Sequence, residues 1–238
     1  MPFNTQYYFH RTLFYLTTPL IVVLLYFFGS TPEYFDLIYI GALGLSCVFC
    51  WKDKDTLGAI VILLGLWCLS EAIYLLPEHL YSLVLTYVLC LILSTLFIDQ
   101  ITAKVTLTIT LYSIAAEIFW WYTDYTNKPQ IHYLIGLLAL TGFARELLLK
   151  RVILLSKYFA FHSGKVALDW QLRSVLFIGY VLLLAVIGEY FIRHLTEYTD
   201  LTFIYYNFGL IATILSAVTL MLIYMHYFNN QSQKHLLA

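Results

Sequence analysis

Residues 181–197 read VLLLAVIGEYFIRHLTE and place one glutamate, Glu189, inside an otherwise apolar run. Two further stretches repeat this arrangement: residues 65–77, GLWCLSEAIYLLP, and residues 111–124, LYSIAAEIFWWYTD. Their glutamates are Glu71 and Glu117. An ionisable side chain at the centre of a bilayer costs about 2.5–3.5 kcal/mol on insertion scales, so such residues usually face a partner, a cavity or a pathway. The three stretches therefore predict membrane-spanning helices with a polar feature inside.

The composition of the whole chain is that of a membrane protein. It is 61% hydrophobic, 18% aromatic and 11% charged, whereas soluble domains are about 45–50% apolar and about 25% charged. The apolar residues extend over the full length and leave no segment long enough for a soluble domain. We expect a single integral membrane domain over residues 1–238, embedded in the lipid bilayer.

Apolar runs that approach the length needed to cross a bilayer, about 20 residues, occur eight times along the chain. They cover residues 12–29, 36–51, 56–76, 80–98, 105–123, 132–150, 171–193 and 202–228. Short polar segments separate most of them. The sequence therefore predicts an all-α, polytopic transmembrane helical bundle of about eight helices.

The basic residues predict how this bundle is oriented. Cytoplasmic loops of membrane proteins carry most of the Lys and Arg residues. With both termini in the cytoplasm, every basic residue except Lys128 and Arg193 lies on the inner side. A seven-helix topology would move whole basic clusters to the outer side. We therefore expect eight helices with both termini cytoplasmic, in the cell membrane, and specifically in a bacterial inner membrane.

This topology gives the three glutamates a common depth. Each lies in a helix that runs outward, and each is followed seven or eight residues later by another acid at the outer end: Glu78, Asp124 and Glu197. The recurrence indicates a pseudo-repeat of helical hairpins, and transporters often bind their substrates between such repeats. We interpret the six acids as a site that binds a proton, a cation or a small solute. The alternative is that each intramembrane glutamate is a neutral, hydrogen-bonded group in helix packing, or snorkels to the interface.

Three histidines lie at the outer ends of the same hairpins: His79, His132 and His194. Imidazoles beside carboxylates can bind a divalent metal or respond to pH. However, no H-x-x-x-H or H-E-x-x-H spacing supports a preformed site, and histidines are common at membrane interfaces. They are therefore weak metal candidates, and the sequence leaves the metal unknown.

A basic stretch follows the sixth run: residues 143–173, FARELLLKRVILLSKYFAFHSGKVALDWQLR. We expect a helix that leaves the membrane and continues along its cytoplasmic surface, where basic side chains meet anionic lipid. The side chains that would contact lipid or a partner protein are Arg145, Lys150, Arg151 and Lys157. The alternative is a simple anchor that follows the positive-inside rule.

Cys47 and Cys50 form a C-x-x-C pair at the predicted cytoplasmic end of the second run. This spacing occurs in redox and metal centres, but thiols stay reduced in the cytoplasm. We interpret the pair as packing residues.

Several classes of function have no support in the sequence. It contains no Walker loop and no G-x-S-x-G motif, and no lysine lies in the last apolar run to hold a retinal. We expect no cofactor and no nucleic acid partner, and we favour a role other than catalysis. A lipid-modifying enzyme with a metal site is the weakest alternative.

Two functions stay open. The first is a proton- or cation-coupled transporter or channel that uses the intramembrane glutamates. The second is a sensory, immunity or accessory membrane subunit that binds a partner protein through its basic cytoplasmic segment.

Overall fold

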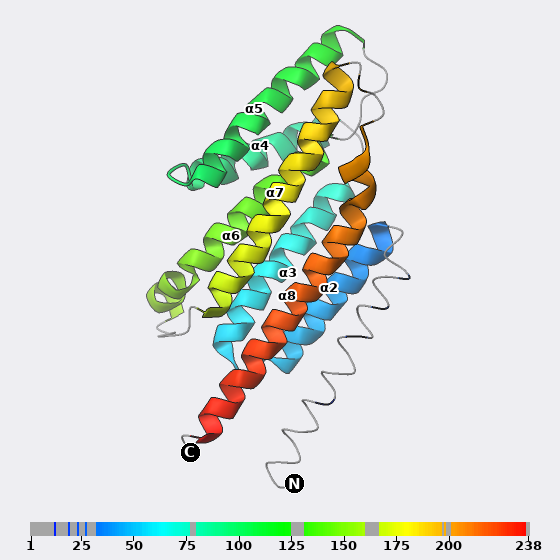
Figure 1. Ribbon diagram of the computed structural model, residues 1–238. Coiled ribbons are helices and arrows are strands. Elements are labelled where there is room, and N and C mark those ends of the chain that lie inside the picture. Colours follow the sequence, from blue (N-terminus) through cyan, green and yellow to red (C-terminus); the bar gives the residue numbers. More distant parts are fainter. Residues whose placement is uncertain are drawn as a thin grey trace. The chain divides into compact units, whose positions relative to one another are not determined.

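The computed structural model describes residues 32–76, 80–124, 131–159, 167–196, 198 and 201–236, with four isolated positions before them (12, 19, 23 and 27). Every regular element in these ranges is an α-helix (Figure 1). The helices are α2 (Pro32–Phe49), α3 (Lys54–Tyr74), α4 (Leu80–Leu96), α5 (Ile101–Tyr122), α6 (Ile131–Phe159), α7 (Ala167–Leu195) and α8 (Phe203–Leu236). The predicted all-α class is therefore confirmed for the described part of the chain.

Five of these helices are long and apolar enough to cross a membrane. The spans are Lys54–Tyr74, Ile101–Tyr122, Ile131–Leu154, Ala167–His194 and Phe203–Asn230, and two shorter apolar helices cover Tyr34–Phe49 and Leu80–Leu96. These helices identify an integral, multi-pass membrane protein. The run predicted at residues 12–29 lies almost wholly outside the described residues, so the count of eight helices and the cytoplasmic termini stay predictions.

The last three helices are longer than a bilayer requires. α6 and α7 each have 29 residues and α8 has 34, whereas about 20 residues cross the hydrocarbon core. α6 continues without a break through the basic stretch as far as Phe159. The helix predicted in that stretch is present up to this residue, and its location at the cytoplasmic surface stays a prediction.

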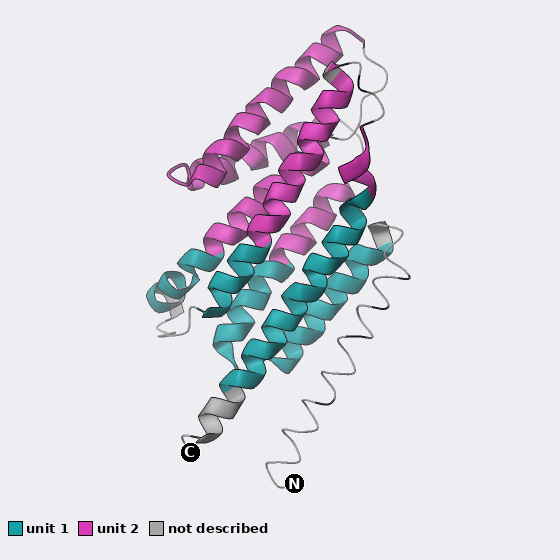
Figure 2. Ribbon diagram, viewed as in Figure 1, with its two compact units in different colours: residues 1–64, 148–175, 207–238 teal, residues 65–147, 176–206 magenta. Residues whose placement is uncertain are grey.

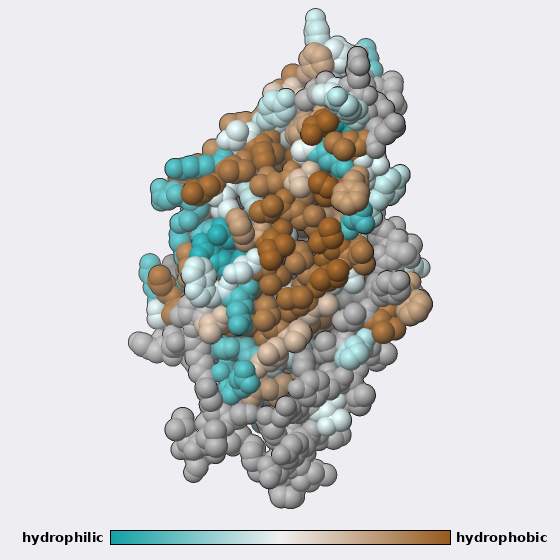
Figure 3. All heavy atoms as spheres, viewed as in Figure 1, coloured by the Kyte–Doolittle hydropathy of each residue, from teal (hydrophilic) through white to brown (hydrophobic). Residues whose placement is uncertain are grey.

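The outer surface of the helices is largely apolar. In the α5 span only 28% of the residues are buried inside the protein. Large apolar side chains on this helix, such as Leu111, Ile118 and Trp121, are exposed. Figure 3 shows many such side chains, in brown, on the face that it presents. Exposed apolar side chains of this extent are expected where lipid, and not water, surrounds the protein.

The chain forms two compact units (Figure 2). Unit 1 contains residues 1–64, 148–175 and 207–238, and unit 2 contains residues 65–147 and 176–206. Four of the helices, α3, α6, α7 and α8, contribute residues to both units. Both units belong to the apolar, helical part of the chain, and the prediction of a single membrane domain stays a prediction.

Unit 1 holds a buried ion pair between Arg151 on α6 and Asp169 in the first turn of α7. Arg151 Nε donates to Asp169 Oδ1 at 2.9 Å, and Nη2 donates to Oδ2 at 2.8 Å. The Nη1 group donates to the backbone carbonyl of Asp55 at 2.7 Å. Each side chain of the pair is only 3% exposed. This bidentate geometry is the strongest form of an arginine–carboxylate contact.

Further hydrogen bonds in unit 1 join residues far apart in the sequence. Asp53 Oδ2 accepts hydrogen bonds from Thr56 Oγ1 at 3.0 Å and from Asn230 Nδ2 on α8 at 3.1 Å. Ser46 Oγ on α2 lies 2.9 Å from the hydroxyl of Tyr224 on α8. These contacts join α2 and the start of α3 to α8 at buried positions.

Replacement of Arg151 by Ala should lower the free energy of unfolding by about 3–5 kcal/mol, because the Asp169 carboxylate would stay buried without its counter-charge. Lys150→Ala changes the neighbouring, exposed residue and should alter stability by less than about 0.5 kcal/mol. Unfolding of both variants in the same detergent measures the difference. Equal stability of the two variants would contradict a structural role for the ion pair.

Candidate functional site

The side of α5 that faces the interior of unit 2 carries hydroxyl groups. Thr102, Thr106, Thr110 and Ser113 are buried, and their spacing of four, four and three residues continues to Glu117, which is half-buried. Residues with this spacing lie on one side of a helix. We call these four residues the hydroxyl face of α5. It leads along the helix to the carboxyl group of Glu117.

α4 presents a similar surface. Its buried residues include Ser82, Thr86, Cys90 and Ser94, four residues apart from one another. α4 and α5 pack against each other. Small residues on both helices allow the two backbones to approach closely, which is the usual way in which helices pack in a membrane.

Many of these hydroxyl groups donate to their own helix. Thr110 Oγ1 donates to the carbonyl of Thr106 at 2.8 Å, and Ser113 Oγ donates to the carbonyl of Ile109 at 2.8 Å. On α4, Thr86 Oγ1 donates to the carbonyl of Ser82 at 2.9 Å. A hydroxyl that donates in this way keeps its two oxygen lone pairs for another partner.

A charged pair lies near the N-terminal end of this face. Arg145 Nη1 donates to Glu146 Oε1 at 3.2 Å and to Thr102 Oγ1 at 3.4 Å. The guanidinium group of Arg145 also lies over the ring of Phe177, 5.0 Å from its centroid. The side chain of Glu146 is 1% exposed, whereas that of Arg145 is 17% exposed. An acid from α6 is thus held inside unit 2 by its neighbour in the chain.

Tyr180 on α7 connects the first two threonines of the hydroxyl face. Its hydroxyl donates to the backbone carbonyl of Thr102 at 2.9 Å and lies 2.8 Å from Thr106 Oγ1. Because the single proton of Tyr180 is directed to the carbonyl, Thr106 is the donor in the second contact. The oxygen of Thr106 is therefore able to accept another hydrogen bond.

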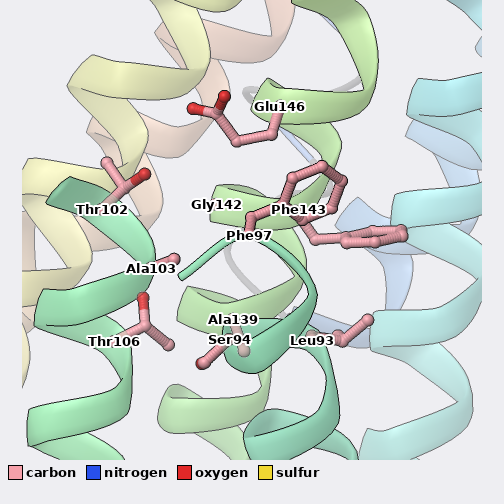
Figure 4. A pocket seen from close by; sticks show the side chains of 10 residues that line it. All are labelled: Leu93, Ser94, Phe97, Thr102, Ala103, Thr106, Ala139, Gly142, Phe143 and Glu146. Carbon is pink, nitrogen blue, oxygen red and sulfur yellow. The ribbon is translucent and has the colours of Figure 1, made fainter. Parts of the chain in front are cut away.

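A small cavity lies next to these groups (Figure 4). It is lined by Leu93, Ser94, Phe97, Thr102, Ala103, Thr106, Ala139, Gly142, Phe143 and Glu146. Its volume is about 10 Å³, which is close to the minimum that one water molecule needs. The wall therefore combines three hydroxyls and one carboxyl with apolar side chains.

A second polar group lies around Glu117. The hydroxyl of Tyr87 on α4 lies within electrostatic range of Glu117 and of Tyr190 on α7. Tyr87 is 4% exposed, and its oxygen has no hydrogen-bond partner among the described residues. Tyr190 in turn contacts the rings of Trp120 and His194, with centroids 6.2 and 4.4 Å away. Glu117 therefore lies near the buried hydroxyl of Tyr87.

Unlike Glu117, Glu189 on α7 lies at the start of another helix, α8. Its carboxylate accepts the backbone N–H groups of Ile204 at 3.1 Å and Tyr205 at 2.8 Å. These are the second and third residues of α8, whose N–H groups have no partner within the helix. A negative charge at this end of a helix also interacts favourably with the helix dipole. This geometry gives Glu189 a structural role as a cap of α8, and its role in ion binding stays a prediction.

The third glutamate of the predicted cluster, Glu71 on α3, is half-buried. One of its carboxylate oxygens is buried without a hydrogen bond from a described residue. The described contacts of Glu117 and Glu189 lead to different groups in unit 2. The convergence of all three glutamates on one cavity stays a prediction.

The outer acids and histidines are only partly described. Glu78, Glu197 and His79 lie outside the described residues. Asp124 is exposed just after α5, with a φ of 48°, a left-handed conformation that aspartate tolerates better than most residues. His132 begins α6, and His194 lies near the end of α7. In the described ranges no group of three or more His, Cys, Asp or Glu residues is placed to hold a metal ion.

The four basic residues predicted to contact lipid or a partner divide into two pairs. Lys150 and Lys157 are exposed on α6. Arg151 is buried against Asp169, and Arg145 is half-buried against Glu146. The two arginines therefore make contacts inside the units, whereas the two lysines are exposed. Contact of the four residues with lipid or a partner stays a prediction.

The C-x-x-C pair consists of free thiols, with Cys47 half-buried and Cys50 buried. Burial, and secondarily the negative charge of Asp53, raises the pKa of the Cys50 thiol to about 12. A thiol with such a pKa is a poor nucleophile. The interpretation of Cys50 as a packing residue agrees with this environment.

A search for charged residues alone does not find the hydroxyl groups of this site. Thr106 and Thr110 belong to the apolar run 105–123, and Thr102 lies just before it. None of the three is ionisable, so a scan for charged residues passes over them. The usable signal is their spacing of four residues in ITAKVTLTIT (101–110), which places all three on one side of a helix.

Glu189→Ala should lower the free energy of unfolding by about 1–3 kcal/mol, because two backbone N–H groups of α8 lose their acceptor. Thr202 precedes the first residue of α8, so Thr202→Asp supplies a local acceptor for the same N–H groups. The double variant should recover part of the loss in a thermal unfolding assay. A double variant as unstable as Glu189→Ala would contradict the capping role.

We compared the chain with protein-family models, with curated proteins and with solved structures, and none of them matches it. Arguments about its function therefore rest on the geometry of the site itself.

Proposed function

We propose that this integral membrane protein moves a proton or another small cation across the bilayer through unit 2. Glu117 is the carboxylate that accepts the ion, and the hydroxyl face of α5 supplies the oxygen atoms that lead to it. The hydroxyl face is the observation that carries the proposal. Apolar residues would pack these positions equally well, whereas hydroxyls and carboxylates interact with protons and hard cations.

The choice of Glu117 over the other two glutamates follows from their contacts. Glu189 is engaged by two backbone N–H groups of α8, and a change in its charge would disturb that helix end. Glu117 lies at the end of the hydroxyl face and beside Tyr87, whose hydroxyl is buried. Glu71 is a second carboxylate on the same ion path, with one buried oxygen. The outer acids Glu78, Asp124 and Glu197 would attract the cation to this end of the path.

The topology that suits this function has eight helices with both termini in the cytoplasm of a bacterial cell. The distribution of Lys and Arg supports it, because most of them then face the cytoplasm. In this orientation Glu117 lies in the outer half of the membrane. The Arg145–Glu146 pair then lies in the inner half.

A second candidate function is that of an accessory subunit which binds a partner protein at the membrane surface. One observation favours it: α6 exposes Lys150 and Lys157 together with Ile153. A helix surface that combines basic and apolar side chains suits an acidic, amphipathic partner segment. In that case reversal of the two lysine charges would release the partner and leave ion movement unchanged.

Glu117→Gln should reduce ion flux in reconstituted vesicles by at least about a hundredfold, because the amide cannot take up and release a proton and lacks the charge that attracts a cation. Asp99→Asn makes the same kind of change at an exposed residue between α4 and α5 and serves as the matched control. The assay follows internal pH and, separately, internal Na⁺ and K⁺ with fluorescent indicators. Wild-type flux in the Glu117→Gln vesicles would exclude Glu117 as the ion-accepting group.

A further inference from the structure

Ser94 is the most informative residue of the cavity between α4, α5 and α6. Its side chain is 3% exposed, and its hydroxyl has no hydrogen-bond partner among the described residues. Figure 4 shows Ser94 among the lining side chains, with Thr106 from α5 and Ala139 from α6 nearby in the same view. A buried hydroxyl without a partner costs about 1–3 kcal/mol, so this position indicates a ligand that the protein itself does not supply.

The neighbouring threonines offer complementary hydrogen bonds. Thr106 Oγ1 uses its proton on Tyr180 and is able to accept. Thr102 Oγ1 accepts from Arg145 Nη1 and keeps its own proton to donate. Both residues line the cavity together with Ser94. A ligand at this place must therefore both donate and accept hydrogen bonds, as a water molecule does.

The size of the cavity suits a single small ligand. Its volume of about 10 Å³ is suited to one water molecule. A hydrated alkali ion needs several water molecules around it and does not fit.

We infer that this cavity is a binding site for one water molecule and that the ion which passes it is a proton. The inference rests on the proposed function and narrows its ion to one species. A proton moves along hydrogen-bonded oxygens and needs no open pore, so a closely packed helix pair such as α4 and α5 is able to carry it. A metal cation needs a pore with a ring of ligands.

The transfer is a sequence of exchanges between oxygens. The carboxylate of Glu146 first takes up a proton from the inner side. It then releases this proton to the water, which forms a new O–H bond as the O–H bond of the acid breaks. The water gives one of its own protons to a hydroxyl of the cavity wall, and that hydroxyl releases its original proton to the next acceptor along the hydroxyl face. Glu146 returns to its carboxylate, the water and the wall hydroxyl end with the number of protons that they had at the start, and one positive charge has moved to the next acceptor.

The first test removes one hydroxyl group and keeps the shape of the side chain. Thr106→Val should slow the proton flux into vesicles under an imposed membrane potential by at least about tenfold, because the relay loses one hydrogen-bonded step. Thr108→Val is the matched control, since Thr108 lies on the exposed side of α5 and donates to the carbonyl of Lys104 at 3.0 Å. Its flux should stay within about twofold of the wild type. Equal flux in the two variants would overturn the inference.

The second test displaces the water and leaves every hydroxyl in place. Gly142 lines the cavity, and a methyl group added there would meet only ordinary contacts, the nearest at 3.4 Å to Tyr180 Cε2 and the next at 3.8 Å to Thr106 Oγ1. Gly142→Ala should therefore fold and reduce the proton flux by at least about tenfold, since the water loses its space. Gly65→Ala adds the same methyl group on α3 with nothing within 4 Å and should keep wild-type flux. Wild-type flux in Gly142→Ala would overturn the water site.

The same vesicles separate failure of this inference from failure of the proposed function. A flux of Na⁺ or K⁺ that depends on Glu117, at constant internal pH, would overturn the proton as the ion and leave the transport function in place. Proton flux that depends on Glu117 but is unchanged in Thr106→Val and Gly142→Ala would overturn the relay alone. Absence of any ion flux in the wild type would overturn both.

Discussion

The structure depends on one constraint: polar groups in the hydrocarbon core cannot form hydrogen bonds with water, so they must find partners inside the protein. The threonines of α5 meet it locally, since Thr110 donates to a carbonyl one turn earlier in its own helix. The Arg151–Asp169 pair meets it between helices. Glu189 meets it for α8, because its carboxylate accepts two N–H groups that the helix cannot satisfy itself. The contacts at helix ends, between helices and in ion pairs thus all supply hydrogen-bond partners to polar groups that water does not reach.

Packing and chemistry are coupled in unit 2. Hydrophobic attraction does not drive helices together in lipid, so α4 and α5 associate through small residues that let the backbones approach. When these small residues are serine and threonine, the same approach lines the interface with oxygen atoms. It also keeps the remaining space small, as in the cavity beside Ser94. Close packing is therefore compatible with movement of a proton and incompatible with an open pore for larger ions.

The helices were predictable from the sequence because hydropathy depends on single residues and their neighbours along the chain. Helices occur in the described parts of all seven runs from residue 36 onward, and the isolated acids at 71, 117 and 189 were visible in the same way. Partners were not predictable. Glu189 contacts residues 204 and 205, and Arg151 contacts residue 169, through helix packing that no local pattern encodes. The hydroxyl face of α5 was predictable in part. The spacing of its residues can be read from the sequence, whereas their burial depends on how the helices pack.

Two buried carboxylates of unit 1 each accept several hydrogen bonds. In unit 1, Asp169 accepts three hydrogen bonds from Arg151, and Asp53 accepts two. A group held in this way is fixed in position, because moving it breaks several contacts at once. In unit 2, the hydroxyls of Ser94 and Tyr87 are buried without a described partner. A fold keeps such costly groups mainly where they serve a function. The unsatisfied hydroxyls of Ser94 and Tyr87 therefore support the proposal that a proton moves through unit 2.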